Sequence, residues 1–424
     1  MAVAPVKKAA TAAVATTGRP APPPQWVPHH LPDGTPITAS AAILVDAATG
    51  RVLWEYNADK RMYPASLTKM MSGLLAAESR DLDKVCSASK LAATTGESSI
   101  ALQQGEPLKL RQVLQASLIK SANDATVMLA ETVGGSVPQF VQMMNNRAAA
   151  MGLRDTHFVN PHGLHAANHY STAADLCKIA RAALQLPAFE QIVGTRETVI
   201  PWQGKAWMRK LVNRNRLLLR WPKCDGVKTG YTKHAGRCLA ASASEGDWRL
   251  ICVVLKSKDS WHDAQSLLQW GFRSFRHVPV AQTDKLYRVR VKRGQARQVM
   301  ARPERNVYVV LAEGETPPVA VQSRTAPVAP LAVGQPVGTL VVGEGQQEQT
   351  VRLLATTAVP ESLWARLCDI KIPQILALLL VLAAAGVLVH GASAKTARAR
   401  RRRLEARKRN ADHRRKSDGQ RKAG

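Results

Sequence analysis

The sequence predicts a mixed α/β protein of the α+β class: an antiparallel sheet flanked by helices, then a small all-β domain and a C-terminal transmembrane helix. Residues 38–278 alternate strand-like and helix-like patterns in the order strand, strand, helices, strands, helix, which suggests one sheet covered by helices. Residues 279–358 contain short alternating strands separated by turns rich in Gly and Pro. Residues 372–390 form an uncharged apolar run.

Residues 1–37 are expected to form a disordered leader, because this region is rich in Ala, Thr and Pro and lacks hydrophobic periodicity. Its segment KKAATAAVATTG has a basic start, but the apolar stretch is short and weakened by threonines, so it is not a convincing signal peptide. Residues 41–59, AAILVDAATGRVLWEYNAD, then predict two strands around an Ala-Thr-Gly turn.

Helical patterns follow at residues 66–78, 110–132 and 137–151. The segment GRCLAASASEGDWRLICVVLKS predicts two more strands, with a turn at Glu245 and Gly246. The segment SWHDAQSLLQWGFRSF closes the region as an amphipathic helix. Together these patterns indicate one domain over residues 38–278.

The smaller β domain, residues 279–358, is indicated by the segments KLYRVRV, NVYVVL, GTLVV and TVRLLA. Residues 359–371 are expected to link it to the run IPQILALLLVLAAAGVLV, which is just long enough to span a bilayer. Residues 391–424 carry 14 Lys/Arg against 3 Asp/Glu. A basic block directly after an apolar run is typical of a single-pass membrane anchor with a cytoplasmic tail, which would place the preceding domains outside the cytoplasm.

The chain is strongly basic, with a net charge of +28. The tail after residue 390 contributes +11 of this charge, so the body is basic too and should favour anionic surroundings such as nucleic acid, anionic lipid or acidic wall polymers. The sequence has no zinc-type cysteine spacing, no phosphate-binding glycine loop and no nucleic-acid-binding motif. We therefore expect no nucleic-acid partner.

The six cysteines are scattered, and most are expected to be buried small hydrophobic residues. Cys224 and Cys238 could face each other and form a disulfide if the segment between them is a hairpin that turns near Tyr231.

A serine and a lysine lie three residues apart in YPASLTKMMSGLL, at the start of the first predicted helix. Ser66 could be an ordinary helix N-cap. Lys69 lies on the same helical face as Ser66, next to the apolar stripe, where an unpaired ammonium is costly. A partly desolvated lysine has a lowered pKa and can take the proton of a serine hydroxyl, so the pair is a candidate nucleophile and base.

Two further segments carry small polar residues. In LIKSANDATVMLAE, Ser121 and Asn123 lie where two helical patterns meet; in DGVKTGYT, Lys228, Thr229 and Gly230 end a strand-like run. Each segment alone is typical of a turn or a surface hairpin. The three together, in the order S-x-x-K, S-x-N and K-T-G, are specific to penicillin-binding proteins and class A β-lactamases.

The chain resembles the D-alanyl-D-alanine carboxypeptidases of the low-molecular-mass penicillin-binding protein group, serine peptidases of the dacA and dacF type. The supporting segments are ILVDAATGRVL, PASLTKMM, KSANDA, FVNPHGLH, HYSTAADL and DGVKTGYT. The resemblance implies the penicillin-recognising serine transpeptidase/β-lactamase-like fold for residues 38–278, then a mostly β domain that stands the enzyme off the membrane. The implied substrate is the peptidoglycan stem pentapeptide, with β-lactam antibiotics as covalent inhibitors and no cofactor. Such an enzyme must be exported, which calls for an N-terminal signal that is weak in this sequence.

The residues then take roles in acyl transfer. Ser66 attacks the peptide carbonyl at a helix N-terminus, and Lys69 takes its proton. By resemblance, Ser121 relays the proton to the departing D-alanine, and Asn123 fixes the substrate amide and Lys69. Lys228 and Thr229 would bind the terminal carboxylate, while Gly230 lets the strand approach closely. The oxyanion would be bound by N–H groups of Ser66 and of the strand after KTG, with Tyr231 or His234 nearby.

Several alternatives remain open. His162, His165 and His169, in HGLHAANH, have a spacing compatible with zinc, although the resemblance places them in a structural loop beneath the site. D,D-endopeptidase activity on cross-links would use the same residues. A β-lactamase would need a glutamate-primed water, and no Glu-x-x-Leu-Asn-like segment lies between Asn123 and Lys228. A non-catalytic penicillin-binding wall anchor is a fourth possibility, disfavoured because all three motifs are intact.

Overall fold

The computed structural model describes residues 30–79, 81–318, 321–322, 326–342, 348–369 and 372–420. Most of the predicted leader lies outside these residues. The chain divides into two compact units. The first contains Met1–Val280, Val307–Ala320 and Val342–Gln349, and the second contains Ala281–Asn306, Val321–Val341 and Thr350–Gly424.

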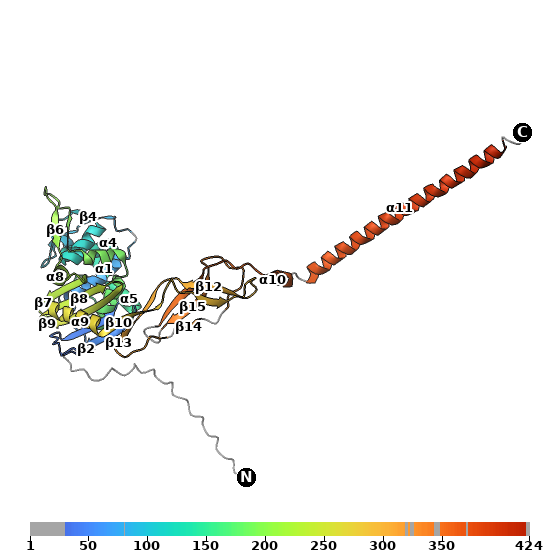
Figure 1. Ribbon diagram of the computed structural model, residues 1–424. Helices are drawn as coiled ribbons and strands as arrows, with labels where there is room; N and C mark the ends of the chain where they lie inside the picture. Colours follow the sequence, from blue (N-terminus) through green and yellow to red (C-terminus); the bar gives the residue numbers. More distant parts are fainter. Residues whose placement is uncertain are drawn as a thin grey trace, which may run out of the picture. The chain divides into compact units, whose positions relative to one another are not determined.

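A five-stranded antiparallel sheet is the centre of the first unit (Figure 1). Its strand order is β2 (Val52–Tyr56), β1 (Ala41–Asp46), β9 (Trp248–Ser257), β8 (Gly236–Glu245) and β7 (Cys224–Thr232). The predicted hairpins at residues 41–59 and 236–257 are confirmed as β1–β2 and β8–β9. In the first turn, the Asp46 carboxylate accepts hydrogen bonds from the backbone N–H and the hydroxyl of Thr49.

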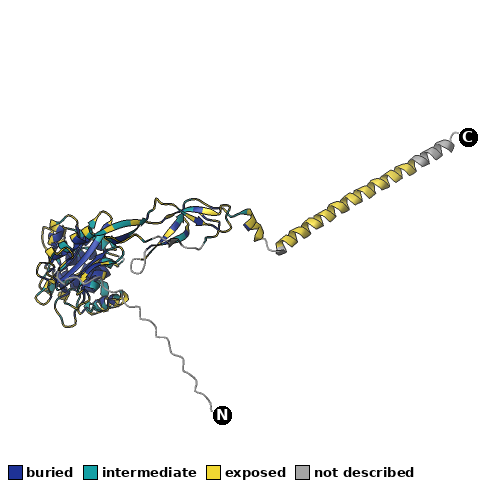
Figure 2. Ribbon diagram, turned by 60° about the horizontal axis from the view of Figure 1, so that its bottom comes forward, coloured by how far each residue is buried: buried dark blue, intermediate teal, exposed yellow. Residues whose placement is uncertain are grey.

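Two separate hydrophobic clusters cover the faces of this sheet, which explains why β1 and the middle of β9 are continuous apolar runs. Alternate residues such as Ile43, Ile251 and Val253 join the larger cluster, and their neighbours Leu44, Leu250 and Cys252 join the other. Figure 2 shows these central strands as buried.

The larger cluster is built with helices from the middle of the chain: α1 (Lys69–Ala77), α2 (Lys90–Thr94), α3 (Leu110–Gln115), α4 (Asn123–Gly134), α5 (Val137–Ala150), α6 (Ala173–Ala183) and α7 (Pro187–Gly194). The opposite face is covered by α8 (Arg216–Arg220) and α9 (Ser260–Ser274), which contribute Leu217 and Leu268. The predicted helices 66–78 and 137–151 and the closing helix are confirmed, with ends shifted by a few residues.

The helical pattern over residues 110–132 is divided in the structure, at the place where the sequence predicts that two helical runs meet. A π-helical turn, Ala116–Lys120, follows α3, and Ser121 then adopts the left-handed conformation with φ +62° before α4 begins. Tertiary hydrogen bonds outweigh helix continuity here. The N–H of Asn123 donates to the carbonyl oxygen of Ser98, and the Asp124 carboxylate accepts from Ser99 and Ile100.

Two short antiparallel strand pairs were not predicted: β3 (Val85–Ser87) with β4 (Pro107–Lys109), and β5 (Glu197–Ile200) with β6 (Arg209–Val212). They are joined by a buried ion pair, in which Arg209 Nη1 lies 2.9 Å from Glu106 Oε1. Strands this short give too little alternation to be recognised in the sequence.

The β-rich region contains two sheets. β10 (Phe275–Ala281) pairs with β13 (Val307–Ala312), and a five-stranded sheet has the order β11 (Tyr287–Arg290), β12 (Gln298–Pro303), β16 (Gln349–Ala355), β15 (Pro336–Val342) and β14 (Val321–Gln322). All four predicted segments form strands. The segment NVYVVL, however, pairs with β10 rather than with the other three, and β10, β12 and β14 were not predicted.

A short helix, α10 (Leu363–Cys368), lies in the predicted linker, and α11 (Ile372–Gln420) follows it as one helix. Its segment Gln374–Asn410 is the one candidate membrane span among the described residues, by length and composition. The described side chains of α11 are exposed (Figure 2), including Leu380 and Leu388. An exposed apolar helix of this kind is unfavourable in water and fits a membrane anchor.

The proposed Cys224–Cys238 disulfide is absent. β7 and β8 do form a hairpin, but it places Ala243 opposite Cys224 and Gly230 opposite Cys238. Both cysteines are free and buried, and burial raises the pKa of each thiol to about 11.

Candidate active site

Ser66 and Lys69 lie at the junction between a 3-10 turn, Ala65–Thr68, and α1. Lys69 Nζ is 3.0 Å from Ser66 Oγ. Ala65, just before the serine, has φ +48°, so the backbone turns sharply at this point. Ser66 is half-buried and Lys69 has no exposed surface. The alternative that Ser66 is an ordinary helix N-cap is wrong. The N-cap of the 3-10 turn is Pro64, and no side chain caps this turn.

Two glycines make room for this turn. A Cβ on Gly163, which has φ +86°, would lie 1.9 Å from the carbonyl oxygen of Ala65. A Cβ on Gly230 would lie 3.1 Å from the backbone nitrogen of Ser66. The loop at Gly163 and the strand β7 therefore contact the Ser66 turn with their backbones.

Lys69 Nζ has two further partners: Asn123 Oδ1 at 2.8 Å and the carbonyl oxygen of His162 at 2.7 Å. Burial, reinforced by the charge of Lys228, holds the pKa of Lys69 well below its usual range. A neutral lysine amine has two N–H donors and one lone pair. Because both carbonyl oxygens can only accept, they take the two N–H groups, and the lone pair is left for the hydroxyl proton of Ser66. The arrangement can therefore deprotonate the serine.

Ser121 and Asn123 approach this pair from the break between α3 and α4. The left-handed backbone at Ser121 turns the chain so that both side chains reach buried positions. Besides contacting Lys69, the Asn123 amide donates through Nδ2 to the carbonyl oxygen of Gly96 at 3.1 Å, which fixes its orientation.

Lys228 enters from β7, the edge strand of the central sheet. Its Nζ lies 2.9 Å from Ser121 Oγ and 2.8 Å from the carbonyl oxygen of Thr229. Burial, together with the charge of Arg214, lowers the pKa of Lys228 to about 7. Thr229 is half-buried, and its neighbour Gly230 lies against Ser66. The structure thus brings all seven predicted site residues into one region: Ser66, Lys69, Ser121, Asn123, Lys228, Thr229 and Gly230.

Two contributors were missed by sequence reasoning. The His162 carbonyl is a backbone group, and no sequence signal distinguishes it beyond its place in the segment FVNPHGLH. Arg214 donates through Nε to the carbonyl oxygen of Lys120, next to Ser121, and its charge lowers the pKa of both site lysines. An exposed arginine after a short strand carries no signature of this role.

The three histidines of the zinc alternative do not form a ligand set. His162 Nδ1 accepts from the N–H of Leu164. His169 Nδ1 accepts from the N–H of Val159, which leaves Nε2–H to donate to the Thr68 hydroxyl at 2.8 Å. Burial lowers the pKa of His162 to about 3 and that of His169 to about 4, so both rings are neutral at pH 7. The ring of His165 stacks on His234 instead.

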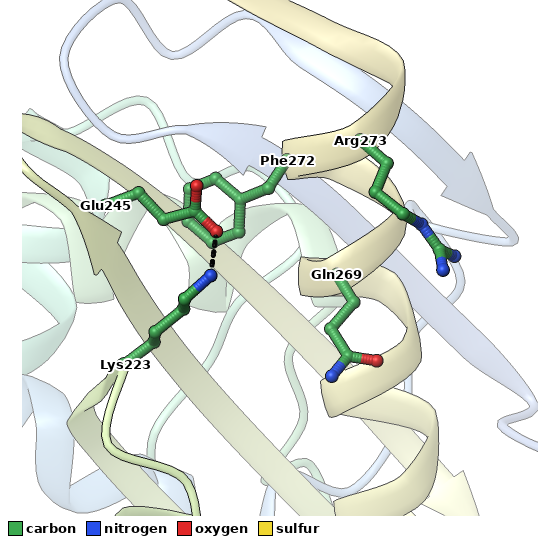
Figure 3. Close-up of a pocket in the computed structure, with 5 residues that line it drawn as sticks. All are labelled: Lys223, Glu245, Gln269, Phe272 and Arg273. Carbon is green, nitrogen blue, oxygen red and sulfur yellow. Dashed lines mark hydrogen bonds and ion pairs between the residues drawn. The ribbon is translucent and has the colours of Figure 1, made fainter.

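One surface pocket lies apart from these residues, between α9 and the end of the sheet where β7 begins and β8 ends (Figure 3). Its lining contains Lys223 and Glu245, which form an ion pair of 2.5 Å, and also Gln269, Phe272 and Arg273. None of the seven site residues lines it, and its charged groups are paired with each other or, for Arg273, with Asp33.

Comparison with known proteins gives two family matches that together span most of the chain. Residues 29–259 match the family described as D-alanyl-D-alanine carboxypeptidase. Residues 275–361 match the family described as penicillin-binding protein 5, C-terminal domain.

Curated relatives agree with these matches. The chain is 35% identical over 288 residues to the D-alanyl-D-alanine carboxypeptidase DacF of Bacillus subtilis, covering 65% of this chain and 73% of that protein. It is 37% identical over 265 residues to DacA of Escherichia coli, covering 58% and 64%.

Solved structures show the same fold. Penicillin-binding protein 5 of Haemophilus influenzae aligns with a TM-score of 0.60 and 29% identity, over 80% of this chain and all of that one. A peptidoglycan synthesis regulatory factor, PBP3, of Streptococcus pneumoniae aligns with a TM-score of 0.67 and 25% identity, over 76% and 99% of the two chains.

Proposed function

Because this chain belongs to the D-alanyl-D-alanine carboxypeptidase family, we propose that its catalytic centre is the group formed by Ser66, Lys69, Ser121, Asn123 and Lys228. Serine carboxypeptidase activity and penicillin binding come with this membership. The observation that carries the assignment of residues is the contact between Ser66 Oγ and the buried amine of Lys69 at 3.0 Å.

The reaction begins when Ser66 Oγ attacks the carbonyl carbon between the two terminal D-alanines of a peptidoglycan stem pentapeptide. Lys69 Nζ takes the hydroxyl proton, a role favoured by burial, which lowers the pKa of this amine. The C–N bond then breaks, and the proton that Lys69 took from Ser66 passes to the departing nitrogen through the hydroxyl of Ser121, whose Oγ lies 2.9 Å from Lys228 Nζ. The resulting ester on Ser66 is hydrolysed by water, which releases the shortened stem. A penicillin acylates the same oxygen.

Substrate recognition is assigned to β7. An extended peptide can pair with the free edge of this strand, as peptides do at exposed sheet edges. Its terminal carboxylate would meet Lys228 and the hydroxyl of Thr229, a cation and a donor suited to a carboxylate. The N–H of Ser66 and an N–H at the end of β7 are the oxyanion donors, because Gly230 holds these backbones in contact.

The rest of the chain is assigned to tethering the peptidase domain to the membrane. In the proposed division, residues 38–278 are the D,D-peptidase domain, 279–358 a spacer and 359–371 a linker. Residues 372–390 span the cell membrane and 391–424 form a cytoplasmic tail. The 14 basic residues after the span favour that orientation, with the catalytic domain outside the cytoplasm where peptidoglycan lies.

An assay on two substrates tests the proposal. The purified chain should release free D-alanine from a stem pentapeptide, and Ser66→Ala should not. A cross-linked stem dimer tests the endopeptidase alternative with the same protein. Faster cleavage of the dimer than of the pentapeptide would reassign the activity to cross-link cutting.

A further inference from the structure

Three aromatic rings gather beside the catalytic centre without being part of it. The rings of His165 and His234 stack face to face, with centroids 3.8 Å apart and planes at 11°. The ring of Tyr63 is nearly perpendicular to both, with its centroid 4.7 Å from that of His165 and 6.3 Å from that of His234. No role assigned so far uses these side chains.

Each ring belongs to a segment that carries part of the catalytic centre. Tyr63 lies three residues before Ser66, just ahead of the 3-10 turn. His165 lies three residues after His162, whose carbonyl oxygen accepts from Lys69 Nζ. His234 lies in the turn between β7 and β8, four residues after Gly230. The stack therefore connects the segments of the nucleophile, the base and the carboxylate-binding strand.

The loop that carries His165 is held firmly at its base. The Asn160 side chain accepts from the N–H of Gly163 and donates to the carbonyl oxygen of Leu164. Gly163 in turn lies against Ala65. His165 thus extends from a fixed point beside the Ser66 turn.

The β7–β8 turn is exposed, as is His165. Tyr231, Lys233 and His234 are all exposed there, and a local bond from the N–H of Ala235 to the Thr232 hydroxyl shapes the tip. The stack on His165 ties this tip to a different segment. Since the end of β7 carries the proposed oxyanion donor, a shift of the turn would move that N–H group away from the reacting carbonyl.

The ring geometry points to a packing contact rather than a metal site. Imidazole lone pairs lie in the ring plane, so two nearly parallel rings direct them side by side and not toward one ion. Offset or edge-to-face contacts between rings are, by contrast, directional attractions that hold segments in register.

We propose that the stack of His165 on His234, buttressed by Tyr63, positions the end of β7 over Ser66 for acylation. His165 and His234 are then positioning residues that act through the β7 backbone and contact no reacting atom. The inference rests on the proposed catalytic role of Ser66.

The test measures the rate at which the full-length protein, in detergent, is acylated by a fluorescent penicillin. His165→Ala and His234→Ala should each slow acylation at saturating penicillin about 10- to 100-fold, the range expected for misplaced reacting groups. The apparent affinity and the melting temperature should change little. His165→Phe and His234→Phe should stay within about twofold of wild type, because phenylalanine keeps the aromatic contact. The control is His262→Ala, which removes an exposed histidine from α9.

A double variant adds a second criterion. Because the two rings act as one contact, His165→Ala/His234→Ala should be no slower than the worse single variant. Multiplying losses, or equal losses for the Ala and Phe variants, would overturn the inference. Wild-type rates in both Ala variants would overturn it as well. Failure of the proposed function is a separate result, seen as undiminished labelling of Ser66→Ala.

Discussion

Lys228 Nζ lies 2.9 Å from Ser121 Oγ, although 107 residues separate them in the sequence. This contact joins the strand β7 to the break between α3 and α4. From the same break, Asn123 Oδ1 accepts a hydrogen bond from Lys69 Nζ. Two lysines thus share one buried site, and burial is the main cause that lowers the pKa of each. Lowered pKa values suit one amine of such a site to act as a base while the partly charged Lys228 binds an anion, and acyl transfer from a carboxylate-terminated peptide requires both.

Lys228→Ala should weaken kcat/KM most for substrates that end in a free carboxylate. A buried charge-assisted hydrogen bond is worth roughly 1.5–3 kcal/mol, or about 10- to 150-fold. The matched amide-terminated substrate should lose much less, because it offers no anion. Steady-state kinetics on the two substrates make the comparison. Equal losses would mean that Lys228 does not bind the carboxylate.

The pH dependence of kcat/KM is a second test of carboxylate binding by Lys228. With its pKa at about 7, Lys228 is charged below pH 7 and loses its charge as the pH rises. For the free-carboxylate substrate, kcat/KM should therefore fall as the pH rises through about 7. Lys228→Arg stays charged and should lack this fall.

Lys69→Ala should lower kcat by at least about 100-fold, the lower end of general-base contributions. Lys69→Arg is the sharper variant, because a guanidinium keeps the charge but does not deprotonate in proteins. It should be as inactive as the alanine variant in single-turnover acylation. An active arginine variant would show that Lys69 acts as a cation and not as a base.

Ser66→Ala should abolish covalent labelling by a fluorescent penicillin, since its Oγ is the atom that is acylated. Ser87→Ala, which removes an exposed serine hydroxyl from β3, should label as wild type does. Gel fluorescence after denaturation reads the covalent adduct directly. Full labelling of the Ser66 variant would place the nucleophile elsewhere.

Gly163→Ala tests the backbone contact beneath Ser66. Its matched control is Gly152→Ala, because both glycines have positive φ, +86° and +68°, but a Cβ at residue 152 meets nothing within 4 Å. Gly152→Ala should lower the free energy of unfolding by about 1–2 kcal/mol, because alanine is strained in the left-handed conformation. Gly163→Ala should lower the free energy of unfolding by roughly 1–3 kcal/mol more than the control does, because its Cβ clashes with Ala65. It should also slow acylation, whereas the control should not. Denaturant titration and labelling rates measure the two effects, and similar values for both variants would contradict the contact.

The central sheet and the S-x-x-K pair could be predicted from the sequence, because both are marked by local sequence patterns. The hairpins around Thr49 and Gly246 combine alternation with turn residues, and the stripe after Ser66 marks α1. The break at Ser121 was only partly predictable, since distant hydrogen bonds from Asn123 and Asp124 produce it. The His162 carbonyl and the stack on His234 depend on tertiary placement, which single-sequence patterns do not contain.

The orientation of α11 can be tested by proteolysis of intact spheroplasts. The apolar segment begins at Ile372, and the basic residues that follow it extend to the end of the chain, so the tail should be retained in the cytoplasm. Each arginine moved through the bilayer core would cost about 2.5–3.5 kcal/mol on insertion scales. External protease should therefore digest the catalytic domain and spare a tag placed after Gly424. Permeabilised cells, in which the tag must be digested, are the control. Loss of the tag with the domain protected would reverse the orientation and separate Ser66 from peptidoglycan.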